Sequence, residues 1–138
     1  MYRLDIELLG LPKTINEWGG RSWHSKFREA NKWHARLLGK MLITRQVAPP
    51  LPLKKAKVTL IRNSSREPDF DNLVQSFKPV VDALKKTLII VDDSSKVIGH
   101  PKYEWQKADP KNGTIRIVVE EIVNINELKS LVLNIGGV

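Results

Sequence analysis

The sequence predicts an α/β (α+β) fold, in which a mixed β-sheet carries helices packed on it in the order β-α-β-α-β-β, plus a short C-terminal helix. Segments with alternating apolar residues, typical of half-buried strands, are interleaved with segments whose apolar residues recur at helical spacing. The chain has 138 residues, of which 41% are hydrophobic and 28% charged, as in a folded domain of ordinary size. We therefore expect one domain over residues 1–138, with 124–138 as a C-terminal extension.

The first strand is predicted over residues 2–8, where leucine and isoleucine at even positions alternate with charged residues at odd positions. A long surface loop is expected over residues 11–25, because proline, a Gly-Gly pair and scattered polar residues occupy this segment. Its tip carries Trp18, Arg21 and Trp23. Loops of this length in small domains are usually functional or disordered.

A long helix is predicted from Ser25, a suitable N-cap, to about Gln46. Its apolar positions at helical spacing are Phe27, Ala30, His34, Leu37, Leu38 and Met41. Another face carries a basic stripe of residues four apart, namely His24, Arg28, Lys32, Arg36 and Lys40. This stripe is either a solvated helix face or a surface that holds phosphates.

A second strand is predicted over residues 55–62, after a proline-rich connector, and a second helix over 72–87. The buried face of this helix is predicted to hold Leu73, Phe77, Val80, Val81, Leu84 and Leu88. Pro79 interrupts it, so we expect a kink or two abutting helical pieces. Two further strands, over 96–107 and 114–123, are expected to form a β-hairpin through the turn at 109–113.

Several classes of protein are excluded by composition. The absence of cysteine rules out a disulfide-stapled scaffold, a thiolate zinc site and a cysteine nucleophile, and favours a cytoplasmic location. The N-terminus lacks the apolar stretch of a signal peptide, and no run of about 18 apolar residues predicts a membrane span. We therefore expect neither export nor membrane insertion.

The positive charge of the chain is unevenly distributed. The formal net charge is +8, with +5 in residues 1–50, +4 in 51–87 and −1 in 88–138. Such a cationic chain attracts polyanions, of which nucleic acid is the commonest. A solubility surface is the alternative explanation, so charge alone does not decide the partner.

Two acidic segments carry the candidate chemistry. Asp69 and Asp71 are separated by one residue, and in an extended segment their carboxylates would point the same way, roughly 6.5–7 Å apart. Asp92 and Asp93 follow about twenty residues later. Several carboxylates without histidine or cysteine suit magnesium or manganese, and such a metal can activate water for attack on a phosphate. Each segment alone is also compatible with an ordinary turn or a helix cap.

Lys78 is the candidate cation beside these acids. It follows Asp71 by seven residues and returns to nearly the same helix face, about 10 Å further along. Its ammonium could stabilise the charged phosphate in the transition state, although a solvated lysine is the alternative. Asp82 shares that face and could pair with it. An EF-hand is excluded, because Val74 and Val80 stand where that loop needs glycine and glutamate.

The sequence resembles the RusA family of Holliday junction resolvases, small endodeoxyribonucleases often carried by phages and prophages. The shared residues are Pro68-Asp69-Phe70-Asp71-Asn72-Leu73, Lys78, Asp82-Ala83-Leu84, Val91-Asp92-Asp93-Ser94 and Val97, within a resemblance over residues 2–122. It implies a homodimer that needs magnesium or manganese, binds four-way DNA junctions and nicks two strands symmetrically in DNA recombination and repair. Asp69, Asp71 and Asp93 become the metal-binding carboxylates, with Asp92 beside them. The family lysine lies four residues after the second aspartate, where this chain has Gln75, so Lys78 is displaced by almost one turn.

The mechanism expected from these residues is metal-assisted hydrolysis by water, in which Lys78 assists Asp69, Asp71 and Asp93. The residues expected to hold the DNA backbone are Arg21, Lys26, Arg28, Lys32 and Arg36. A PD-(D/E)xK nuclease is rejected, because its acid and lysine would fall in the turn at 109–113 and not on a strand. The remaining alternative is a non-catalytic nucleic-acid-binding module that uses Trp18, Trp23 and the basic stripe.

Overall fold

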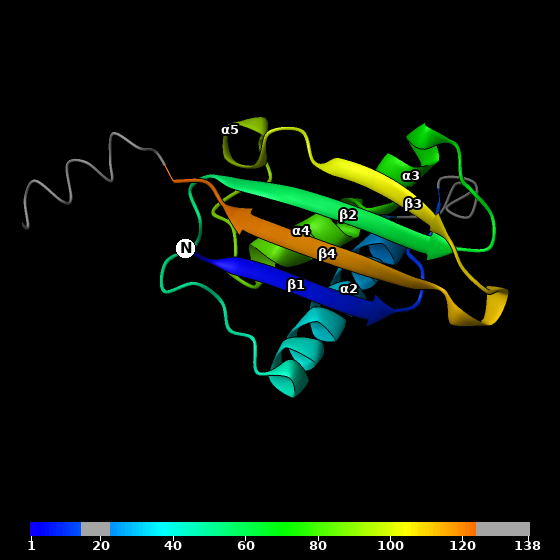
Figure 1. The fold of residues 1–138 in the computed structure, drawn as a ribbon, viewed down its shortest axis with the longest axis horizontal. Coiled ribbons are helices and arrows are strands. Elements are labelled where there is room, and N and C mark those ends of the chain that lie inside the picture. Colours follow the sequence, from blue (N-terminus) through cyan, green and yellow to red (C-terminus); the bar gives the residue numbers. More distant parts are fainter. Residues whose placement is uncertain (15–22, 124–138) are drawn as a thin grey trace, which may run out of the picture.

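A four-stranded mixed sheet with strand order β1-β4-β2-β3 organises the chain (Figure 1). The structure is a computed structural model that describes residues 1–14 and 23–123, with side chains in the first helix from residue 26 onward. The observed order confirms the predicted β-α-β-α-β-β class. The expected short C-terminal helix, the 124–138 extension and the tip of the predicted loop, including Arg21, lie outside the described residues.

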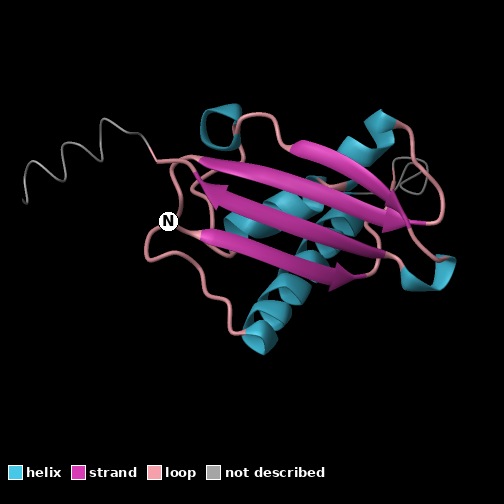
Figure 2. Ribbon diagram, viewed as in Figure 1, coloured by secondary structure: helices cyan, strands magenta, loops and turns pink. Residues whose placement is uncertain are grey.

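The helices and strands have the following bounds: β1 Arg3–Leu9, α2 Trp23–Thr44, β2 Ala56–Ser64, α3 Phe70–Ser76, α4 Lys78–Lys86, α5 Ser95–Ile98, β3 Lys102–Lys107, η1 Pro110–Asn112 and β4 Thr114–Glu121. Strand β4 pairs antiparallel with both β1 and β2, and β2 pairs in parallel with β3. Helices α2 and α4 cover the same face of the sheet (Figure 2). Within the described residues, no helix is long and apolar enough to cross a membrane.

The core lies between the sheet and these helices. Leu4, Ile6 and Leu8 are buried, as the alternation in the first strand predicts. Helix α2 contributes Ala30, Trp33, Leu37 and Met41. The predicted core positions Phe27 and Leu38 are wrong, since they are 53% and 42% exposed. The buried stripe runs instead through the fully buried Trp33, which turns both of those side chains away from the sheet.

The second helix is divided as Pro79 predicts. Helices α3 and α4 abut at Phe77, and Pro79 lies in the first turn of α4, where a missing backbone N–H costs no hydrogen bond. Leu88 was predicted to be buried and is 62% exposed, because the helix ends at Lys86 and Leu88 has a positive φ of 60°. Ile89 and Ile90 enter the core in its place.

The predicted hairpin is wrong. Residues 96–98 belong to the short helix α5, and β3 pairs with β2 and not with β4. Strand β4 lies between β1 and β2, while β3 forms an edge of the sheet. The compositions of the strands account for this order, because β4 has five buried residues whereas every residue of β3 is at least partly exposed.

Candidate functional site

The first acidic segment lies in the turn between β2 and α3. Asp69 is the residue before the helix, with φ −56° and ψ 149°, and its side chain makes no capping hydrogen bond. Asp71 lies in the first turn of α3, and both carboxylates are exposed. The helix-cap interpretation of Asp69 therefore does not account for its side chain, which remains available to a ligand.

A cavity of about 450 Å³ adjoins Asp69. Its lining consists of Leu11, Thr14, Arg62, Ser64, Ser65, Arg66, Glu67, Pro68, Asp69 and Asn72. The Arg62 side chain is only 6% exposed, and its Nη1 donates a hydrogen bond of 2.7 Å to the carbonyl of Pro12. A buried cation thus ties the start of the 11–25 loop to the end of β2, beside one of the candidate carboxylates.

Hydrogen bonds from β3 brace the turn that carries Asp69. The indole N–H of Trp105 donates to Ser64 Oγ at 2.9 Å, and the Ser64 hydroxyl donates to the carbonyl of Arg66 at 2.8 Å. The backbone N–H of Ala108 also donates to the Ser64 carbonyl at 2.9 Å. Ser64 therefore holds the turn before Asp69 through both its hydroxyl and its backbone carbonyl. These bonds favour a fixed position for the Asp69 carboxylate.

The second acidic segment packs against the end of α4. Asp92 Oδ1 lies 3.2 Å from Lys85 Nζ, and the hydrogen bond from Lys85 lowers the pKa of Asp92. Burial raises the pKa of Asp82, and the negative charge of the nearby Asp93 raises it further. Lys78 begins α4 with an exposed side chain, and its charge acts in the opposite direction on Asp82. The charges of Asp93 and Lys78 thus both act on Asp82 on this side of α4.

The two acidic segments lie beside different parts of α3 and α4. Asp71 is in the first turn of α3, whereas Asp92 contacts Lys85 in the last turn of α4 and the charge of Asp93 acts on Asp82 in the middle of α4. In residues 1–14 and 23–123, no group of three or more histidine, aspartate or glutamate side chains could hold a metal ion. Asp69, Asp71 and Asp93 therefore form no such group within these residues.

The predicted DNA-binding residues on α2 differ in their surroundings. Lys26, Arg28 and Arg36 are exposed. Lys32 is partly buried, lies 3.3 Å from Glu29 Oε1 and sits over the ring of Trp33. Glu29 is 5% exposed and also accepts a hydrogen bond from the Trp33 indole at 3.2 Å. Part of the basic stripe is thus bound to the core of the protein.

Sequence reasoning missed Arg62, Ser64 and Trp105 as parts of this region. Arg62 shares the parity of Val58 and Leu60 along β2, so the alternation already placed it on the buried face. No sequence pattern indicated that Trp105 pairs with Arg62 across parallel strands, and β3 was expected to form a hairpin with β4.

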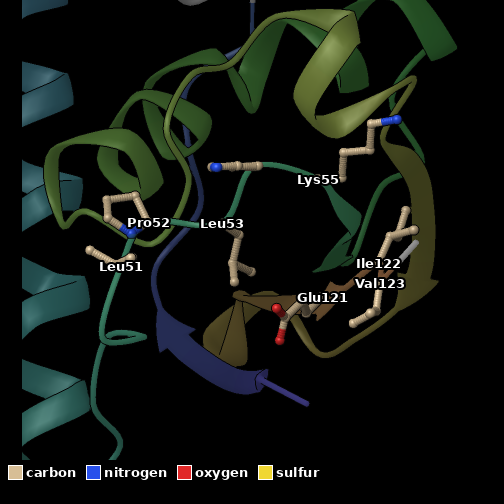
Figure 3. Close-up of a pocket in the computed structure, with 8 residues that line it drawn as sticks. Leu51, Pro52, Leu53, Lys55, Glu121, Ile122 and Val123 are labelled. Atoms are coloured by element: carbon tan, nitrogen blue, oxygen red, sulfur yellow. The ribbon is translucent and has the colours of Figure 1, made fainter. Parts of the chain in front are cut away.

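A separate cavity of about 360 Å³ lies at the other end of β2 (Figure 3). It is lined by Leu51, Pro52, Leu53, Lys54, Lys55, Glu121, Ile122 and Val123. None of the predicted catalytic residues is among them, so the cavity beside Asp69 is the candidate site. Comparisons with protein-family models and with curated proteins found no match to the chain.

Proposed function

We propose that this chain is a RusA-type, metal-dependent endodeoxyribonuclease that resolves four-way DNA junctions by paired symmetrical nicks, in DNA recombination and repair. The observation that carries the proposal is the braced turn at Asp69. The Asp69 side chain, which makes no helix-cap hydrogen bond, lines a cavity walled by Arg62 and Arg66, and the exposed Asp71 follows in the first turn of α3. This combination suits a phosphodiester, which the arginines would attract and which a metal held by the carboxylates would help water to attack.

Different residues of the chain have different roles in this proposal. Asp69, Asp71 and Asp93, with Asp92 beside Asp93, would hold magnesium or manganese, which supplies activated water when bound. Lys78 would stabilise negative charge that develops on the phosphate. The cationic residues of the first helix and of the preceding loop would hold the DNA backbone.

The separation of the acidic segments supports a homodimer. Because Asp69, Asp71 and Asp93 form no three-carboxylate group within the described residues, we propose that the site combines Asp69 and Asp71 of one copy with Asp93 of another. A two-fold dimer also has two equivalent sites, as paired nicking of a junction requires. With DNA as the substrate and no cysteine to stabilise an exported form, the proposed location is the cytoplasm.

Cleavage of a synthetic four-way junction tests this function. The wild-type protein is expected to produce paired nicks with magnesium or manganese and none with EDTA. Asp71→Asn is expected to abolish cleavage but to retain junction binding, whereas Asp109→Asn, at an exposed aspartate outside the proposed site, cleaves normally. Equal cleavage by both variants would contradict the assignment of Asp71.

A non-catalytic nucleic-acid-binding module is the second candidate. It is favoured by one observation, namely that the described residues contain no three-carboxylate group able to hold a metal. Junction binding that persists with and without magnesium, but without any cleavage where a control resolvase is active, would support this module over the nuclease.

A further inference from the structure

An exposed aromatic side chain lies between the two carboxylates of the candidate site. Phe70 is the first residue of α3, directly between Asp69 and Asp71, and it is 65% exposed. A single exposed phenylalanine is ordinary on a protein surface, so exposure alone assigns no role. The first turn of a helix favours proline and acidic residues, and phenylalanine is only a moderate helix former. Neither the core nor the start of α3 therefore accounts for Phe70.

Two further aromatic residues hold the ring of Phe70 in place. The rings of Phe70 and Tyr103, on β3, meet edge to face, with centroids 6.3 Å apart and an interplanar angle of 87°. The Tyr103 ring lies 6.1 Å from that of Phe77, which is fully buried where α3 meets α4. Helix α3 and strand β3 lie at the same side of the sheet (Figure 1). Phe70 is thus connected to the core, and a ring held in this way loses little conformational freedom when a ligand binds.

The edge-to-face contact leaves a flat apolar surface open. Whichever of the two rings supplies the edge, Tyr103 covers at most one face of the Phe70 ring. The 65% exposure of Phe70 agrees with this geometry. A planar group can stack on such an open aromatic face. Nucleic-acid bases are planar, and stacking on aromatic side chains is a general mode of binding bases that have an uncovered face.

The neighbours of Phe70 favour a nucleotide over other planar ligands. Asp69 lines the 450 Å³ cavity together with Arg62 and Arg66, so cations that attract a phosphate lie beside the residue that precedes Phe70. Consecutive Cα atoms are about 3.8 Å apart, so a phosphate at Asp69 and a base on Phe70 would belong to the same nucleotide or to adjacent ones. The net charge of +8 also favours a polyanion.

We infer that Phe70 stacks on a base at the branch point of DNA and thereby determines the preference of this protein for branched DNA over continuous duplex. The inference rests on the proposed nuclease function and deepens it by naming a residue that recognises its substrate. In a continuous duplex both faces of each internal base are covered by neighbouring bases, and uncovering one costs free energy. The stack is interrupted at a branch point, so a base there can meet Phe70 at a lower cost.

Binding without cleavage tests this role. Affinities for a synthetic four-way junction and for a duplex of the same sequence are measured in EDTA at one salt concentration, because phosphate contacts depend on salt. Phe70→Ala and Phe70→Leu are expected to weaken junction binding by about fivefold or more and duplex binding by less than about twofold. Phe70→Trp keeps a stacking surface and should retain the preference. Leu51→Ala is the matched control, because Leu51 is 77% exposed and lies at the cavity in Figure 3.

Removal of single bases from the junction identifies the group that contacts Phe70. Each junction of a series lacks one base next to the branch point. For at least one of them, the wild-type protein should lose affinity by about the factor that Phe70→Ala loses on the intact junction. Phe70→Ala should be insensitive to the same missing base, because both changes remove one interaction. Additive losses at every position would overturn the inference.

Three other results would also overturn it. They are wild-type protein that binds junction and duplex equally or binds neither, folded Phe70→Ala and Phe70→Leu variants that keep the full junction preference, and a dimer that dissociates when Phe70 is replaced, since Phe70 would then contact protein. Circular dichroism and sedimentation velocity measure folding and oligomeric state. The proposed nuclease is judged separately, by metal-dependent junction cleavage of the wild-type protein. A junction preference that depends on Phe70 without any cleavage supports the stacking role and contradicts the proposed function.

Discussion

Ser64 is the position where one hydroxyl holds the turn that carries Asp69. It is 4% exposed, accepts a hydrogen bond from the Trp105 indole and donates one to the Arg66 carbonyl. Ser64→Ala removes both bonds at once without adding bulk. Because Trp105 lies on the edge strand β3, this change removes the side-chain link between the turn and the sheet edge and leaves the backbone bond from Ala108 to Ser64.

The expected cost follows from these contacts. A hydrogen bond contributes about 0.5–1.5 kcal/mol to stability, and a donor that loses its partner in a mostly buried place costs about 1–3 kcal/mol. Trp105 is partly exposed, so water can replace some of the lost bond. We expect Ser64→Ala to lower the free energy of unfolding by about 2 kcal/mol. Ser65→Ala, one residue away and without such bonds in the described structure, should change it by less than about 0.5 kcal/mol.

Urea unfolding of Ser64→Ala, Trp105→Phe and the double variant measures how much the Trp105–Ser64 hydrogen bond contributes to stability. The tryptophan-to-phenylalanine change removes the indole N–H and keeps an aromatic ring. The two changes should be non-additive by about 0.5–1.5 kcal/mol, since each removes the same interaction. Additive effects would refute the reasoning that this bond braces the turn. On the proposed function, junction cleavage should also fall more in Ser64→Ala than in Ser65→Ala.

Three further predictions concern other parts of the chain. Trp33→Ala should lower the free energy of unfolding by about 3–5 kcal/mol in urea, because Trp33 is fully buried, whereas Leu38→Ala at an exposed position should cost less than about 1 kcal/mol. The raised pKa of Asp82 means that the folded state binds its proton more tightly than the unfolded state, so this group disfavours folding above its folded pKa and the penalty is lost as the pH falls. Asp82→Asn should therefore raise the melting temperature at pH 7 but not near pH 3, and an equal rise at both would contradict the role of charge. Lys78→Ala should slow single-turnover junction cleavage by about 10²–10³-fold, and cleavage at the wild-type rate would remove Lys78 from the proposed mechanism.

Local features of the fold were predictable from the sequence. The alternation of Leu4, Ile6 and Leu8 identifies the buried face of β1, because a strand has a strict period of two. Pro79 marks the division between α3 and α4, because its ring and missing N–H act on its own helix turn. In both cases the cause lies within a few residues of the effect.

The remaining features depend on contacts between distant segments. Strands β3 and β4 follow one another along the chain, yet β4 inserts beside β1 because its apolar residues need neighbours on both sides. The same holds for the candidate site. The spacing between Asp71 and Asp93 does not reveal whether their side chains meet, because α3 and α4 lie between them in the chain and the path of the chain after α4 determines where Asp93 lies.

Complementation between two inactive variants tests most directly the claim that the active site combines carboxylates from two copies. Asp69→Asn and Asp93→Asn should each abolish junction cleavage alone. When the two variants are unfolded together and refolded, about half of the dimers are mixed, and each mixed dimer has one site with both Asp69 and Asp93 intact. The nicking rate should therefore return to roughly a quarter of the wild-type rate. Mixtures that form mixed dimers but remain inactive would contradict a site shared between two chains.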